Sequence, residues 1–227
     1  MKKLIITSFA ALTVISANAA ELNPYVSEKI SFSRVNVLNP ELVFSVPGQA
    51  TNKGTDESDN VFGNKLAVGL IIPAVARVEL EWGINTAAKV ESGLNGNPAV
   101  GTSSDIKTQT FGVNAYYDFD TGTKFTPYIG AGAGFAYIKS KAASYGAMPA
   151  NSSINGEDSI NTFIWNVGIG ASYALTEELA IDVGYRYSDL GTAESKLDYN
   201  EAGSHKFISG KADLISHEIT LGARYAF

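Results

Sequence analysis

Apolar and polar residues alternate with a period of two in seven stretches of this chain. The cleanest is residues 77–85, where Val78, Leu80, Trp82 and Ile84 alternate with charged residues and Gly83. Successive side chains of a β-strand point to opposite faces, so each stretch predicts a strand with one apolar and one polar face. Helical spacing fits none of them. The other six stretches are residues 65–72, 110–119, 128–137, 162–173, 179–188 and 215–227.

An eighth, weaker strand is expected in residues 22–35. Val26, Ile30 and Phe32 share one face, but Glu28 falls on that same apolar face. A β-bulge near Glu28, or an earlier start of the strand, would repair the pattern. With this segment the chain predicts eight strands.

The connections between the expected strands alternate in length. Short ones fall at residues 73–76, 118–125 and 175–178, and long polar ones at residues 36–61, 89–104, 141–159 and 190–210. Short turns on one side and long loops on the other are typical of an up-and-down barrel in an outer membrane. We therefore predict an all-β protein, an eight-stranded antiparallel transmembrane β-barrel with short periplasmic turns, four long extracellular loops and both termini in the periplasm.

The first residues have the three parts of a cleaved signal peptide of the Sec type. Lys2 and Lys3 are followed by an apolar run to Ile15 and by the small-residue site Ala17-Asn18-Ala19. The alternative, a membrane anchor, needs about 20 apolar residues, and the run is shorter. We expect residues 1–19 to be removed and residues 20–227 to form the barrel domain in the bacterial outer membrane.

Composition narrows the possible functions. Removing Lys2 and Lys3 from 17 basic residues leaves 15 against 23 acidic ones, so the formal net charge moves from −6 to −8. An acidic exported chain lacks the excess of positive charge that binds nucleic acid. The chain has no cysteine, which excludes disulfides, a catalytic cysteine and cysteine-ligated zinc.

Periodicity alone does not say which face of the sheet is inside. A soluble, lipocalin-like barrel would have the apolar face inside, whereas a membrane barrel has it against lipid. The run Gly130 to Gly134 puts three glycines on the polar face, which suits a narrow interior better than a water-exposed surface. We therefore expect nine charges to form a network in the lumen: Lys29, Lys65, Arg77, Glu79, Glu81, Asp182, Arg186, Glu218 and Arg224.

Aromatic residues on the apolar face concentrate near the ends of the expected strands. Rings at both membrane–water boundaries form the girdles of outer-membrane barrels. We expect a girdle made of Tyr117, Phe119, Phe125, Tyr137, Phe163, Trp165, Tyr185 and Tyr187.

Three stretches resemble the small outer-membrane β-barrels of the opacity-protein and outer-membrane-protein-A type: residues 126–139, 179–191 and 219–227. In that family a terminal aromatic preceded by alternate apolar residues resembles the signal that the barrel-assembly machinery reads. The resemblance implies this role for Ile219, Leu221, Tyr225 and Phe227. It also implies a surface antigen, an adhesin or a structural part of the outer membrane.

Candidate chemistry in the sequence is weak. Ser216, His217 and Glu218 look like a catalytic triad, but adjacent residues of a strand point to opposite faces. Asp56, Glu57 and Asp59 form an acidic group that lacks the ligand spacing of a calcium loop. We expect no enzyme activity, no cofactor and no metal site.

The expected role is a monomeric surface scaffold whose loops serve adhesion or act as a surface antigen. Its expected partners are outer-membrane lipid, the barrel-assembly machinery and a host or extracellular ligand at the loops. A narrow, low-conductance pore for small solutes is the alternative. The near balance of the interior charges favours a plugged lumen over a selective one.

Overall fold

A computed structural model describes residues 23–44, 52–53, 56–72, 76–94, 97–145, 155–201 and 204–227. Within these ranges the regular structure is entirely β. The signal peptide expected at residues 1–19 lies outside them. The strands are β1 (Asn23–Phe44), β2 (Asn52–Lys53), β3 (Glu57–Ile72), β4 (Ala76–Asn85), β5 (Ala88–Leu94), β6 (Asn97–Asp118), β7 (Phe125–Tyr145), β8 (Asn155–Ala174), β9 (Leu179–Glu201) and β10 (Ser204–Ala226).

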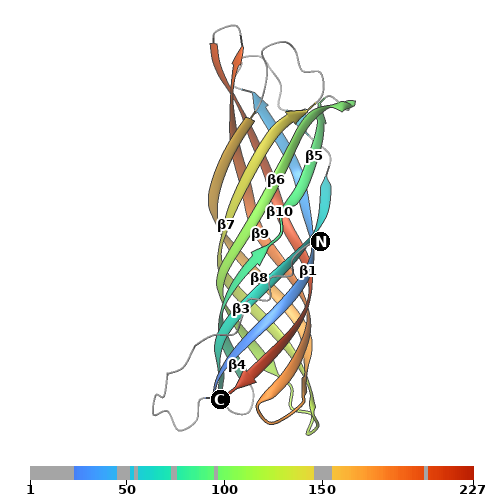
Figure 1. Ribbon diagram of the computed structural model, residues 1–227, viewed down its shortest axis with the longest axis vertical. Helices are drawn as coiled ribbons and strands as arrows, with labels where there is room; N and C mark the ends of the chain where they lie inside the picture. Colours follow the sequence, from blue (N-terminus) through green and yellow to red (C-terminus); the bar gives the residue numbers. More distant parts are fainter. Residues whose placement is uncertain are drawn as a thin grey trace, which may run out of the picture.

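The strands form one closed antiparallel barrel (Figure 1). The order of the wall is β1, β3, β4, β6, β7, β8, β9 and β10, and β10 pairs with β1 to close it. The strand β5 continues β4 along the edge of β6, and β2 adds a short pairing to β1. The prediction of an eight-stranded antiparallel barrel is confirmed.

The two ends of the barrel differ. At one end, here called the turn end, the chain reverses at residues 119–124 and 175–178, and Phe227 N donates to Pro24 O at 3.0 Å. Gly122 has a φ of 65°, which a residue with a side chain rarely adopts, so the turn at Thr121-Gly122 depends on this glycine. The opposite end is called the loop end. The short connection expected at residues 73–76 lies largely outside the described residues.

Where the structure describes the long loops expected from the sequence, they are mostly strand. β1 continues to Phe44, β7 to Tyr145 and β9 to Glu201, while β10 begins at Ser204. These segments pair residue by residue, for example Tyr199 with Lys206. The sequence-based assignment was wrong here because backbone pairing continues where the alternation of apolar and polar residues becomes irregular.

Of the two alternatives offered for Glu28, a β-bulge or an earlier start of the strand, the structure shows no bulge at this residue. Glu28 pairs in regular register with Leu66 on β3 and with Ala223 on β10. The register of β1 shifts instead between Leu38 and Glu41, where Asn39 has a φ of 48°. The Glu28 side chain therefore stays on the outer face of the barrel.

Candidate functional site

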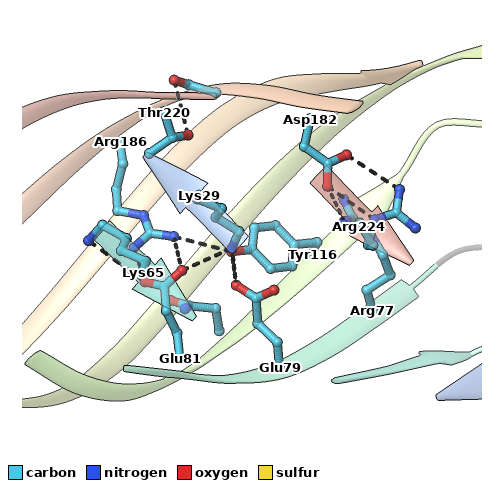
Figure 2. A network of polar contacts seen from close by, with 12 residues as sticks. Lys29, Lys65, Arg77, Glu79, Glu81, Tyr116, Asp182, Arg186, Thr220 and Arg224 are labelled. Atoms are coloured by element: carbon cyan, nitrogen blue, oxygen red, sulfur yellow. Dashed lines mark hydrogen bonds and ion pairs between the residues drawn. The ribbon is translucent and has the colours of Figure 1, made fainter. Parts of the chain in front are cut away.

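The nine charged residues predicted for the inner face all lie inside the barrel, buried or half-buried: Lys29, Lys65, Arg77, Glu79, Glu81, Asp182, Arg186, Glu218 and Arg224. Figure 2 labels all of them except Glu218 and shows two groups that follow one another along the lumen. They come from five different strands, β1, β3, β4, β9 and β10, so the barrel closure itself brings them together.

Glu81 is the centre of the first group. Its Oε2 accepts a hydrogen bond from Lys29 Nζ at 2.9 Å, and its Oε1 lies 2.5 Å from Arg186 Nη1 and 3.8 Å from Lys65 Nζ. Lys65 Nζ also lies 3.1 Å from Glu218 Oε2. Three cations thus surround one buried carboxylate, which is the arrangement that makes a buried charge tolerable.

Glu79 extends this group toward the turn end. It is 2% exposed, and its Oε1 accepts hydrogen bonds from Lys29 Nζ at 2.5 Å and from Tyr116 OH at 2.7 Å. Tyr25 OH donates to its Oε2 at 3.0 Å. Both carboxylate oxygens are therefore satisfied without water.

The second group lies nearer the turn end and is built on Asp182. Arg224 Nε donates to Asp182 Oδ2 at 3.1 Å, and Ser172 Oγ donates to Oδ1. Arg77 Nη1 lies 3.8 Å from Asp182, while its Nε and Nη2 donate to the two oxygens of Asp118 at 2.7 and 2.9 Å. This forked pairing holds the Arg77 guanidinium in one orientation.

Sequence reasoning omitted Asp118 from the charge network. With Asp118 the two groups contain five basic and five acidic residues. Its position on the inner phase of its strand was the available signal. The exact balance favours mutual neutralisation over selection of ions of one sign.

Two tyrosines join the groups. The guanidinium carbon of Arg77 lies 4.8 Å from the ring centroid of Tyr116 and 4.9 Å from that of Tyr128. Inward-facing glycines make room for these rings, since a Cβ on Gly130 would lie 2.5 Å from Tyr116 and one on Gly170 would lie 2.4 Å from Tyr128. The glycine-rich strands are thus matched to a lumen filled with side chains.

Two small cavities lie beside the network. One of about 20 Å³ borders Arg77 and Asp182, and one of about 40 Å³ borders Lys65 and Glu218. Each has room for one to a few water molecules. Glu218 Oε1, which is buried without a hydrogen-bond partner, faces the second cavity and is a natural site for such a water.

Beyond the charges, toward the loop end, the lumen becomes apolar. A cluster of buried side chains fills it: Val37, Ala136, Ile138, Ile164, Leu190 and Leu214. The sequence analysis missed this layer because it treated the inner face as polar along its whole length. The charged network and the apolar layer are stacked along the same interior.

The outer face carries a band of exposed apolar side chains. The predicted girdle residues Tyr117, Phe119, Phe125, Tyr137, Phe163, Trp165 and Tyr185 are exposed on this face, and Tyr187 is half-buried. On β8 the band runs from Phe163 to Tyr173, which spans about 25 Å for a strand tilted by ~40°. That height matches the apolar band of an outer-membrane barrel.

Above this band the two faces exchange their character. On β6 the outward residues change from Phe111 to Gln109 and Lys107, while Ile106 points inward beside the apolar cluster. On β7 and β8, Lys141 Nζ lies 3.0 Å from Glu157 on the outside, and hydrogen bonds from Lys139 and Lys141 lower the pKa of Glu157. The wall beyond the band thus has a water-facing exterior and an apolar core.

The candidate catalytic run does not assemble. Ser216 and Glu218 point into the barrel, whereas His217 points outward and its Nδ1 lies 2.6 Å from Tyr185 OH. Among the described residues no group of three or more His, Asp or Glu is placed to hold a metal ion. Asp59 instead accepts hydrogen bonds from the backbone of Asn60 and Lys89 at the loop end.

The residues expected to form an assembly signal lie on the outer face of β10. Ile219, Leu221, Tyr225 and Phe227 are between 45% and 65% exposed. The Tyr225 and Phe227 rings make an edge-on contact at 5.4 Å. They therefore form an apolar strip that runs along the outer face of the last strand, from the level of Phe32 down to the turn end.

Comparison with known proteins shows which family the chain belongs to. Residues 7–227 match the family described as outer membrane protein beta-barrel domain. The chain belongs to this family. The expectation of an outer-membrane barrel from the polarity of the faces is thereby confirmed, and so is the location in the outer membrane. Within the described residues, no helix is both long and apolar enough to span a membrane.

Relatives of this outer-membrane barrel occur in several Gram-negative bacteria. The chain is 32% identical over 218 residues to the outer membrane protein PagN of Salmonella typhimurium, with 89% of each chain covered. It is 27% identical over 172 residues to the opacity protein opA60 of Neisseria gonorrhoeae, covering 66% of this chain and 63% of that protein. The crystal structure of OprG from Pseudomonas aeruginosa has the same fold, with a TM-score of 0.53 and 17% identity, covering 90% of this chain and 97% of that one.

Proposed function

We propose that this outer-membrane barrel is a non-conducting surface scaffold that holds rigid β-hairpins outside the cell for adhesion. The observation that carries the proposal is the exchange of polarity above the lipid band. The same strands continue there as a water-exposed barrel with its own apolar core of Ile138, Ile164 and Leu214.

Rigidity is what makes such hairpins useful for contact. A preorganised binding surface loses less conformational entropy when it meets a partner than a flexible loop does. The paired extensions of β7 with β8 and of β9 with β10 supply this order up to the pairs Ala143–Asn155 and Glu201–Ser204. The similarity to opacity proteins supports the same role.

The filled lumen supports a scaffold over a pore. The charged groups neutralise one another, and the apolar cluster stands between them and the loop end. The water-sized cavities beside Lys65 and Arg77 are the feature that favours the alternative, a narrow pore. The proposed function includes no catalytic activity.

We also infer that Ile219, Leu221, Tyr225 and Phe227 are what the barrel-assembly machinery recognises. Their exposed, alternating side chains at the end of the last strand support this role. The same rings then lie at the membrane boundary of the finished barrel.

Trimming the hairpins tests the adhesive role. In one variant an Asn-Gly turn replaces residues 197–208, so that the directly paired Lys196 and Ser209 close a two-residue hairpin. A matched variant replaces residues 143–155 in the same way between Ala142 and Gly156. Both variants keep the apolar cluster, so the barrel should fold as before.

The readout is the number of bacteria that adhere to cultured epithelial cells, at equal surface levels of folded protein. We expect at least one trimmed variant to lower adhesion by about tenfold, which corresponds to the loss of ~1.4 kcal/mol of binding. Adhesion by both trimmed variants equal to that of the full chain would contradict the proposal.

A further inference from the structure

The lipid-facing band contains one polar spot. Between the two girdles of the described strands, apolar or aromatic residues fill every outward-facing position except Glu28 on β1 and Asn64 on β3. Asn64 Nδ2 donates to Glu28 Oε1 at 3.0 Å. This pair is the reason that β1 was the least regular strand in the sequence.

The pair lies within the apolar band. Phe32 and Phe62, whose rings are 5.2 Å apart, mark the girdle above it, and Tyr225 lies opposite Val26 below it. Glu28 is four residues below Phe32, about 10 Å along the axis for a strand tilted by ~40°. A carboxylate at this depth faces hydrocarbon, where water does not satisfy polar groups.

The two side chains have more hydrogen-bonding capacity than they use on each other. The carboxylate of Glu28 has a second oxygen, and Asn64 has a second amide hydrogen and a carbonyl oxygen. Within the described chain no other residue bonds to these atoms. The unused donor and acceptor therefore stand side by side across β1 and β3, and Ile30, the direct partner of Asn64, borders them.

We propose that this patch of Glu28, Ile30, Asn64 and Ala223 is the contact through which a second copy of the chain associates in the membrane. A two-fold axis that passes between Glu28 and Asn64, beside Ile30, brings Glu28 of one copy to Asn64 of the other, twice over. The patch is self-complementary, because the two-fold rotation places the acceptor Glu28 of each copy against the donor Asn64 of the other. This complementarity identifies a second copy of the chain as the partner.

The neighbouring residues suit such a contact. Ala223, opposite Glu28 on β10, is small and exposed, so it leaves space for close approach. Ile30 is 58% exposed and supplies an apolar centre. The inference goes beyond the scaffold function and departs from the monomer expected from the sequence. Two copies side by side would present their hairpins together, which raises avidity without any new contact to the target.

The absence of cysteine from the chain makes a clean cross-linking test possible. An Ile30→Cys variant of the full chain is oxidised in intact outer membranes. The matched control is Ile129→Cys, an exposed isoleucine on β7, four strands around the barrel from β1. We expect a disulfide-linked dimer of this chain for Ile30→Cys, in about tenfold excess over the control.

Variants of the polar pair decide whether it drives the contact. Adding Glu28→Leu and Asn64→Leu to Ile30→Cys should reduce the dimer to the level of the control, while Glu28→Gln, which keeps a hydrogen-bonding amide, should retain it. As a check free of cysteine, the unmodified chain extracted in lipid nanodiscs should have the mass of two chains. In the cross-linking experiment, three outcomes would overturn the inference: a cross-link to a different protein, equal yields of disulfide-linked dimer for cysteines at residues 30 and 129, or a dimer that persists in the double leucine variant. In nanodiscs, the mass of a single chain would overturn it.

Discussion

At the scale of single residues, Glu81 is the node of the lumen. It contacts Lys29, Lys65 and Arg186 within 3.8 Å, and each of these cations is itself buried or half-buried. Removing a carboxylate shared by three cations costs more folding stability than removing one partner of an exposed ion pair, because several buried cations then lack a partner.

Glu81→Ala should therefore destabilise the folded barrel by about 3–5 kcal/mol, the usual cost of removing one partner of a buried ion pair. The measurement is the free energy of unfolding by urea in lipid vesicles. Glu177→Gln, at an exposed turn position, is the control and should leave stability unchanged. A cost for Glu81→Ala no larger than the ~1 kcal/mol of a surface pair would show that the network is not a structural plug.

At the scale of the strand, long strands such as β6 and β7 carry two opposite patterns, one after the other along their length. Near the turn end the outer positions are apolar and the inner ones are polar or glycine, as on β7 from Ile129 to Phe135. Toward the loop end Ala136 and Ile138 point inward and Lys139 points outward. The change marks the level at which lipid gives way to water, because each face must match its own surroundings.

Ile164→Asp tests whether the inner apolar layer holds the protruding wall together. An unpaired carboxylate in that layer is costly, so we expect the wall to open and trypsin to cleave after Lys139 or Lys141 in protein reconstituted in vesicles. Lys29 and Lys65, inside the membrane part, should stay protected. The matched control Asn161→Asp puts the same charge on the outer face of β8 and should behave as the unmodified chain. Equal resistance of the two variants would mean that the apolar layer does not support the hairpins.

At the scale of the whole molecule, side chains fill the interior of the barrel at two successive levels along its axis. The charged groups plug the membrane part, and the apolar cluster fills the part above. An interior of eight strands is just wide enough for side chains to fill, so neither plug needs a separate domain. In the proposed scaffold, this filled interior supports the strands that extend to the loop end (Figure 1).

This arrangement predicts that the refolded protein gives no single-channel current in a planar bilayer. Arg186→Ala removes the contacts to Glu81 and Tyr116 and joins the cavity beside Lys65 to the one beside Arg77. Because the apolar cluster still fills the lumen above, we expect brief current steps when Arg186→Ala is combined with Ile164→Asp, which opens that layer. Arg34→Ala removes an arginine from the outer face and should stay silent. Steady current from the unmodified chain would favour the narrow pore over the closed scaffold.

Most of the membrane-spanning part could be predicted, because every second residue of a strand faces lipid there and must be apolar. The inner position of Lys29, Glu81 and Arg186 follows from strand phase alone. Their contacts do not, because Lys29 and Glu81, on β1 and β4, and Arg186, on β9, come together only when the barrel closes. The sequence also gave no sign that Tyr116 and Tyr128 would enclose Arg77, since that depends on the space left by glycines of neighbouring strands.

The sequence by itself determined the number of membrane strands and their phase, because these depend only on alternation within one strand. It also indicated the solvent on each face, through the glycines on the polar face of residues 130–134. Tertiary structure decided where the strands end and what fills the lumen. The segments predicted as loops became paired strands because pairing depends on the partner strand, and the inward apolar layer of Val37, Ile138 and Leu214 forms only when residues distant in sequence meet inside a closed wall. Register also decided the place of Glu28, which pairing with both neighbours holds on the lipid face.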